Sequence, residues 1–201
     1  MTIKPGEPWG TNATTPPHLV VADDEAAAAR LVQHGTHMVA IRSGDLLRAL
    51  GRTSTNAVAN EGGECLLLPC DMLQVSINDT EEVSAVSSVV VGRWHSPQWW
   101  VSAGGFLGAL NIAPRAHPND GQVDALTFAP NIGLRQLLAI RSRMRRGDHL
   151  PHPALRMQRG ERLQWTAPRA VPITIDGRRH GRAHRIVVNV LPDAFTLCVP
   201  R

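Results

Sequence analysis

Apolar runs in the first part of the chain are short and separated by one helical segment. Residues 18–22 (HLVVA) and 37–41 (HMVAI) are typical of strands. Between them, Asp23-Asp24 supply an N-cap and a first-turn charge for a helix over residues 26–33. This order predicts a βαβ unit with parallel strands.

The segments on either side of this unit are irregular in composition. The N-terminal residues, up to Pro16-Pro17, are rich in Pro, Gly and Thr and are expected to form an irregular arm that Trp9 pins down. Residues 52–64 are polar and contain glycine, which predicts a change of layer or domain. We therefore expect a truncated α/β segment over residues 1–64 and a second domain over residues 65–201.

Apolar runs of strand length dominate after residue 65. Their density predicts a sandwich or barrel, with a turn or bulge in the last strand at Pro192-Asp193. The predicted fold class is α+β: a C-terminal β-sandwich-like domain with one basic helix, preceded by a small βαβ remnant of an α/β nucleotide domain. The expected strands cover residues 66–78, 87–94, 99–103, 123–129, 154–158, 162–167, 171–176 and 186–199.

The one helix expected in this domain covers residues 131–146 (NIGLRQLLAIRSRMRR), and Gly147 closes it. Its last turns carry four arginines. A helix C-terminus favours such a cluster through its macrodipole, so a solvated basic end is one interpretation. A patch that faces a membrane or phosphate groups is the other.

Charge and cysteine content favour a cytoplasmic protein with buried thiols and an anionic partner. The net charge is +4 and arginine carries nearly all of the cationic charge, which suits phosphate or carboxylate contacts; a genomic base bias is the alternative explanation. Cys65, Cys70 and Cys198 form neither a disulfide framework nor a zinc pattern and are expected to be buried thiols. No signal peptide or membrane-spanning run is visible, so a cytoplasmic protein is expected.

An acidic turn separates the apolar run 106–112 from the strand expected at residues 123–128. Pro118-Asn119-Asp120-Gly121 is a turn signal, and Asp120 and Asp124 bracket a glycine that can adopt positive φ. Carbonyls and a carboxylate could face one another there, as Mg²⁺ or Ca²⁺ requires. A plain tight turn explains the same residues.

A second turn, Ser43-Gly44-Asp45, follows the second parallel strand and leads into a short helix over residues 46–50. Anionic ligands bind at such turns in α/β folds, although a simple strand-to-helix turn needs the same residues. His149 and His152 are separated by Pro151, which excludes a helical pair of metal ligands. No nucleophile motif and no Walker loop occur in the sequence.

The order of several motifs resembles one known family. GALNIAPRAHPNDGQVDALTF is followed by a helix closing in RMRRGDHLPHPAL, then VPITIDGRRHG, then VVNVLPDAFTLCVP. This order is similar to the C-terminal β-sandwich of the diacylglycerol-kinase and sphingosine-kinase superfamily of lipid kinases, from about residue 66 to the last residue. IRSGDLLRALG is similar to the family segment G-T-G-N-D-F-A-R-x-L-G that ends the nucleotide-binding domain.

The resemblance implies roles for particular residues. Asp176 falls on the general base toward the lipid hydroxyl, and Ser43, Gly44 and Asp45 fall on the nucleotide side. Asp120 falls on the carboxylate of a structural Mg²⁺ site. His117 and Gln122 would add backbone carbonyls to that ion. The implied cofactors are Mg²⁺ and ATP.

Three departures separate the chain from the family pattern. No G-G-D-G-T occurs, Ser43-Gly44-Asp45 replaces the family's G-N-D, and Arg178 stands where a glutamate is expected after Asp176-Gly177. A guanidinium there could pair with Asp176 and lower its pKa. For catalysis by a kinase, Asp45 and Asp176 should approach one cleft, with Arg42 or Arg178 at its rim.

Two functions follow from these observations. One is ATP-dependent phosphorylation of a lipid hydroxyl by a diacylglycerol-kinase-like protein. The alternative is a catalytically inactive family member that binds a lipid, a nucleotide or a protein. The expected partner is a lipid substrate or a membrane surface, with a partner chain or homo-oligomer also open and no specific nucleic acid. A peripheral position at the membrane is the alternative to a purely cytoplasmic one.

Overall fold

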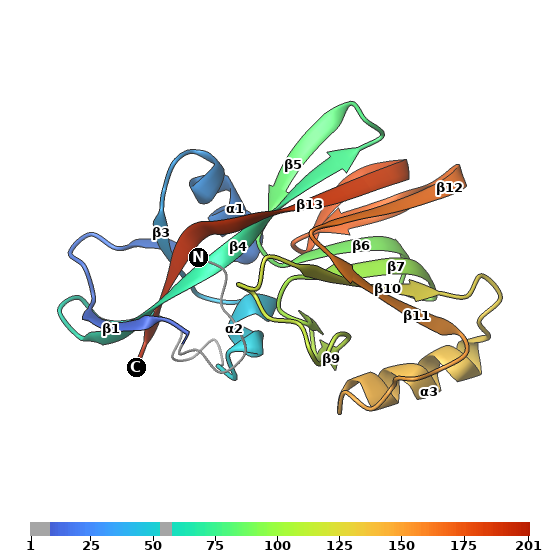
Figure 1. The fold of residues 1–201 in the computed structure, drawn as a ribbon, viewed down its shortest axis with the longest axis horizontal. Helices are drawn as coiled ribbons and strands as arrows, with labels where there is room; N and C mark the ends of the chain where they lie inside the picture. The colour runs from blue at the N-terminus through green and yellow to red at the C-terminus, as the bar shows by residue number, and fades with distance from the viewer. Residues whose placement is uncertain (1–8, 53–57) are drawn as a thin grey trace.

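The computed structural model describes residues 9–52 and 58–201. Most of the described chain forms β-structure around one large sheet, and the fold is β-sandwich-like, as predicted (Figure 1). The helices are α1 (Glu25–Gln33), α2 (Asp45–Ala49) and α3 (Leu134–Met144). The strands are β1 (Thr11–Thr14), β2 (Val20–Ala22), β3 (Met38–Ile41), β4 (Glu64–Ile77), β5 (Glu81–Ala85), β6 (Ser88–Arg93), β7 (Ser96–Ser102), β8 (Phe106–Leu107), β9 (Leu110–Asn111), β10 (Val123–Phe128), β11 (Leu155–Gly160), β12 (Arg162–Ile175) and β13 (Arg178–Pro200).

The βαβ unit forms as its pattern predicts. β2 and β3 pair in parallel, with Val20 opposite Val39, and α1 packs on them. The Asp24 carboxylate caps α1 by accepting the backbone N–H of Ala27 at 2.8 Å. The Asp-Asp pair ahead of α1 therefore does what an N-cap sequence is expected to do.

This unit is joined to the main sheet through β3. β3 pairs in parallel with the end of β13, where Thr196 lies opposite Met38. The helices and strands of the unit share a hydrophobic core with the first half of β4 and the last part of β13, including Leu68 and Phe195. The division at residues 64 and 65 stays a prediction, and hydrogen bonds and side-chain packing cross it.

The long strands β4 and β13 hold the fold together. They pair antiparallel from Ile77 opposite Ile186 to Cys65 opposite Pro200, with one irregularity between Leu191 and Phe195. This irregularity contains the predicted Pro192-Asp193 bulge. The sheet continues in the order β1, β4, β13, β12, β6, β7, β10 and β11. β1 and β5 both pair with β4 on the edge opposite β13, β1 at the start of β4 and β5 at its end.

The N-terminal arm is more ordered than predicted. Residues 11–14 form β1 and pair antiparallel with β4, from Thr11 opposite Leu67 to Thr14 opposite Glu64. Trp9 donates its indole N–H to the carbonyl of Pro69 at 2.9 Å and lies edge-on to the ring of His117. The expected anchoring role of Trp9 is confirmed, because its indole is both hydrogen-bonded and packed against the core.

Two further differences concern strands. The apolar run 106–112 forms a separate two-stranded hairpin, β8–β9, instead of a strand beside β10. β10 pairs with β7 and β11. The runs 162–167 and 171–176 form one long strand, β12, with register shifts where it bends.

α3 covers the end of the sheet formed by β7, β10 and β11. Its inner side chains Leu137, Ile140 and Met144 are buried against Trp100 and Phe128. Figure 1 shows α3 at the opposite end of the sheet from α1. Within the described ranges, no helix has the length and apolar character needed to cross a bilayer.

Candidate functional site

Asp176 occupies the tight turn between β12 and β13. Asp176 and Gly177 both have positive φ, 43° and 75°, which is the pattern of a two-residue hairpin turn. The Asp176 carboxylate points back and accepts three backbone N–H groups, from Val86 at 2.8 Å, Ser87 at 3.0 Å and Ser88 at 2.9 Å. Asp176-Gly177 thus forms a hairpin turn, and the Asp176 side chain also joins β12–β13 to the start of β6.

Asp176 is buried, with 6% of its surface exposed. Burial raises its pKa to about 6, and the three N–H groups oppose this rise. Arg178 does not pair with Asp176; its guanidinium contacts the Asp24 carboxylate at 2.5 Å. The predicted lowering of the Asp176 pKa by Arg178 is therefore corrected to a rise caused by burial.

Asp45 begins α2 and accepts the backbone N–H of Gly108 at 2.8 Å. Gly44 before it has φ of 156°, and a Cβ at Gly44 would lie 2.5 Å from the carboxyl carbon of Glu25. Ser43 donates its hydroxyl to the carbonyl of Asp23 at 2.9 Å. The glycine in this turn is therefore required by close packing against Glu25.

Glu25 is the site residue that the sequence analysis missed. It begins α1, is buried, and accepts the backbone N–H of Leu46 at 2.6 Å. Burial, together with the charges of Asp176 and Asp45, raises its pKa to about 8, against the hydrogen bonds from Leu46 and Ser87. The available signal was its place directly after a parallel strand, where α/β folds bind ligands.

These residues converge on one cleft, which we call the carboxylate cleft. Asp45 and Asp176 both line it, as a catalytic role would require. Its volume is about 330 Å³. The lining residues are Asp24, Glu25, Ser43, Gly44, Asp45, Ser88, Val90, Leu107, Gly108, Thr174, Asp176 and Gly177.

The lining of the carboxylate cleft is acidic. Four of its side chains are carboxyls, and Asp24 and Glu25 occupy the N-terminus of α1. A helix N-terminus attracts anions, but here the protein's own carboxyls take that place. Arg178 lies at the rim through its pair with Asp24, whereas Arg42 pairs with Asp23 at 3.3 Å.

The predicted metal-site residues lie in the loop before β10. Asp120 accepts the backbone N–H of Gln122 at 3.0 Å with one oxygen, and its other oxygen contacts the guanidinium of Arg159. The ring of His117 accepts the backbone N–H of Asn119 through Nδ1 at 3.1 Å, and burial lowers its pKa. Asp120 does lie at a turn, but β9 before it and β10 after it are not adjacent strands.

These residues do not fit a Mg²⁺ site made of side-chain ligands. Both oxygens of Asp120 already have donors, and Arg159 supplies positive charge there, also lying 3.7 Å from Asp124. Within residues 9–52 and 58–201, no group of three or more His, Cys, Asp or Glu side chains could hold a metal ion. We therefore derive no step through Mg²⁺ at this loop.

Asp71 holds the same loop in place from β4. One of its carboxylate oxygens accepts the backbone N–H of Gly121 at 2.8 Å, and the other accepts that of Asp193 at 3.0 Å. Its own N–H donates to the carbonyl of Pro118 at 2.8 Å. The acidic turn is thus fixed by a carboxylate 50 residues earlier in the chain.

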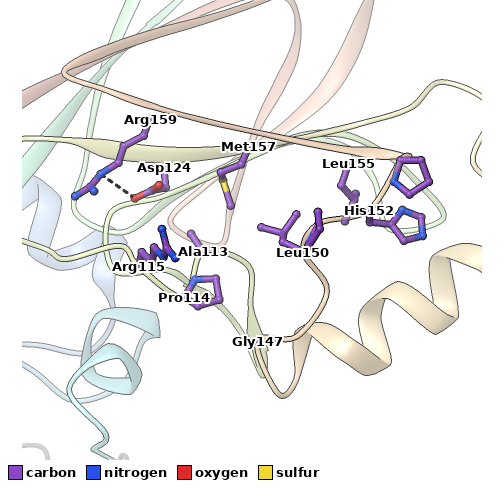
Figure 2. A pocket seen from close by; sticks show the side chains of 12 residues that line it. Ala113, Pro114, Arg115, Asp124, Gly147, Leu150, His152, Leu155, Met157 and Arg159 are labelled. Carbon is purple, nitrogen blue, oxygen red and sulfur yellow. Dashed lines mark ion pairs between the residues drawn. The ribbon is translucent and has the colours of Figure 1, made fainter.

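A second, larger cavity of about 1000 Å³ lies beside β10, β11 and the loop after α3 (Figure 2). Leu150, Leu155 and Met157 supply apolar surface, and Asp124 and Arg159 form an ion pair at one end. We call it the apolar cavity. Its combination of apolar walls and a charged end suits an amphipathic ligand.

Comparisons with known proteins agree with the β-sandwich-like fold. A family model described as "YegS C-terminal NAD kinase beta sandwich-like domain" matches residues 73–199. Three solved structures from Bacillus anthracis str. Sterne are similar in fold. The first, described as "a putative diacylglycerol kinase", has a TM-score of 0.56 and 12% identity, covering 91% of this chain and 78% of that chain.

A second structure with the same description has a TM-score of 0.54 and 14% identity, covering 81% of this chain and 68% of that one. A third, described as a diacylglycerol kinase, has a TM-score of 0.54 and 13% identity, covering 90% and 76%. No curated protein sequence matches. At these identities, the structures establish likeness of fold alone.

Proposed function

Because the chain belongs to the family of the YegS C-terminal NAD kinase beta sandwich-like domain, we propose that it carries out ATP-dependent phosphorylation of a lipid hydroxyl. The observation that supports this proposal is that Asp45 and Asp176 line the same cleft although they lie 131 positions apart in the chain. The lipid-kinase resemblance assigns these two residues to the nucleotide side and to the general base.

In this proposal Asp176 accepts the proton of the lipid hydroxyl as the phosphoryl group moves. With a pKa of about 6, the Asp176 carboxyl is mostly ionised at neutral pH, and this pKa is close enough to neutral pH for the carboxylate to take up a proton as a general base. Because three N–H groups already hold its carboxylate, the substrate hydroxyl must share one of these oxygens. The remaining wall includes the apolar side chains Val90 and Leu107, which suit the carbon skeleton of an alcohol.

The apolar cavity supports a lipid as the class of substrate. Its volume of about 1000 Å³ lies at the upper end of ordinary ligand pockets. Its apolar walls can bury hydrocarbon, and the guanidiniums of Arg115 and Arg159 can face a polar or anionic end of the same molecule.

A binding module without catalysis is the second candidate, and one observation favours it. The helix N-terminus that follows β2 carries Asp24 and Glu25, and no G-G-D-G-T segment occurs in the sequence. Phosphoryl transfer depends on positioning and charge neutralisation of the phosphates, which carboxyls at this place oppose. Such a protein would bind lipid through the apolar cavity and would transfer no phosphate.

The two candidates are separated by an assay of the whole protein with labelled Mg·ATP and diacylglycerol in mixed micelles. The proposal expects label in the lipid product and a loss of about 10²-fold or more in Asp176→Asn, the range for one general base. Asp79→Asn is the matched control, since Asp79 is also a turn aspartate with positive φ, at 60°, and lies outside the cleft.

If the unaltered protein transfers no label, the kinase proposal is wrong. Titration calorimetry with Mg·ATP and with a short-chain lipid then shows which ligand the module takes. Loss of lipid binding on Leu150→Asp, with ATP giving no heat, would support the binding module.

A further inference from the structure

Three large apolar side chains are more exposed than any other in the described residues. Trp94 is 63% exposed, Leu134 is 61% exposed and Leu138 is 54% exposed. Leu134 and Leu138 lie one turn apart on the outer face of α3, and Trp94 lies in the turn between β6 and β7. Clustered exposed apolar groups mark interaction sites more often than scattered ones do.

Arg141 joins Trp94 to α3. Its guanidinium lies 3.3 Å from the centre of the Trp94 ring and donates a hydrogen bond to the Trp94 carbonyl. Arg141 follows Leu138 by three residues and Leu134 by seven, so by helical spacing it borders the face that carries the two leucines, while its own side chain is buried. Arg141 therefore places the Trp94 indole at the edge of this face.

The core does not need these three side chains. The buried face of α3 consists of Leu137, Ile140 and Met144, which pack on the sheet, and of Arg141, whose side chain contacts Trp94. Leu134 and Leu138 lie on a different face, which remains open to solvent. The outer face of α3 is thus an apolar surface beyond what folding requires.

The charge around this surface has one sign. Arg135 and Arg145 are exposed and lie on the same side of α3 as the leucines by helical spacing. The sequence contains no Asp or Glu from residue 129 to residue 147. Helices that bind at a membrane surface typically carry exposed Trp and Leu side chains flanked by arginines.

We propose that Trp94, Leu134 and Leu138, flanked by Arg135 and Arg145, form a docking patch for an anionic lipid bilayer. The apolar side chains enter the headgroup region, and the arginines contact lipid phosphates. Charge complementarity favours an anionic bilayer over a protein partner. The patch is a helix face flanked by exposed arginines with no carboxylate of α3 beside them, whereas a protein interface usually balances its charges. This inference does not depend on phosphoryl transfer in the carboxylate cleft.

The test is sedimentation of the whole protein with vesicles of phosphatidylcholine, either alone or mixed with phosphatidylglycerol. We expect binding to the mixed vesicles, a blue shift of Trp fluorescence, and weaker binding as salt is added. Leu134→Ser with Leu138→Ser should weaken binding at least about tenfold, because less apolar surface enters the bilayer. Arg135→Gln with Arg145→Gln should weaken binding to the mixed vesicles alone.

Leu191→Ser is the matched control, since Leu191 is also exposed, at 36%, but lies on β13. Circular dichroism shows whether each variant folds, and Trp94→Ser gives a second test if the double leucine variant does not. The proposal is overturned if the unaltered protein does not bind the mixed vesicles. It is also overturned if the leucine and arginine double variants bind these vesicles as strongly as Leu191→Ser does. It is also overturned if the patch variants abolish self-association, measured by light scattering, while vesicle binding is absent.

Discussion

The carboxylate of Asp176 accepts the backbone N–H of Ser88 at 2.9 Å, which ties the β12–β13 hairpin to the first residue of β6. The same carboxylate also accepts the N–H groups of Val86 and Ser87. Asp176 therefore both stabilises the fold and lines the carboxylate cleft. A substitution of Asp176 is expected to change the stability of the protein as well as the chemistry of the cleft.

Asp176→Asn should destabilise the protein by about 1–3 kcal/mol, because an amide NH₂ replaces one acceptor oxygen facing buried N–H groups. Asparagine tolerates the positive φ, so the backbone turn itself should survive. The measurement is urea unfolding, with Asp79→Asn as the control for a turn aspartate whose side chain is in an exposed ion pair. Equal stability of both variants would show that the three N–H contacts contribute nothing.

Glu25→Gln should change how stability depends on pH. The pKa of Glu25 is raised in the folded protein to about 8, so the contribution of this group is fully present below its unfolded value near 4.5 and is lost as pH rises through about 8. The amide keeps an oxygen to accept the Leu46 N–H and cannot ionise. Glutamine should therefore stabilise the protein at alkaline pH by an amount on the order of a few kcal/mol.

The measurement for this variant is the free energy of unfolding at pH values from about 4.5 to about 8, compared with the unaltered protein, because the folded and unfolded states bind different numbers of protons in this range. Glu61→Gln is the control, because Glu61 is exposed. The difference between Glu25→Gln and the unaltered protein should grow with pH. A constant difference across the range would mean that Glu25 does not titrate there.

Gly44→Ala should unfold or strongly destabilise the βαβ unit. An alanine Cβ would lie 2.5 Å from the carboxyl carbon of Glu25, which is buried and held by the Leu46 N–H. Gly51→Ala is the control, since Gly51 also has positive φ, at 68°, but has nothing within 4 Å of the added methyl group. Gly51→Ala should lose about 1 kcal/mol from backbone strain alone, and thermal unfolding should show a larger loss for Gly44→Ala.

Millimolar Mg²⁺ should leave the melting temperature unchanged if Arg159 already neutralises Asp120 and Asp124. A ligand that binds only the folded state raises the melting temperature, so the measurement is a thermal scan with Mg²⁺ and with EDTA. A rise with Mg²⁺ that Asp120→Asn abolishes would restore the Mg²⁺ assignment at this loop. Asp148→Asn is the control, because Asp148 pairs with Arg146 at another exposed site.

Local pattern alone determined most secondary structure. The expected helix over residues 131–146 forms as α3, and the expected strand 123–129 forms as β10, because their apolar periods match the faces they bury. The parallel βαβ unit also follows from local signals, since Asp24 caps α1 within its own segment. β1 was missed because its stability comes from pairing with β4, which lies about 50 residues away and leaves no periodic apolar signal in Thr11–Thr14.

Only the tertiary structure decided the site. The sequence placed Asp45 and Asp176 at turns, and the pairing of β12 with β6 is what buries Asp176 under the N–H groups that precede β6. Glu25 carries no motif, and its raised pKa arises from burial beside Asp176 and Asp45. Burial and charge proximity depend on residues distant in the chain, so neither can be read from the pattern around a single residue.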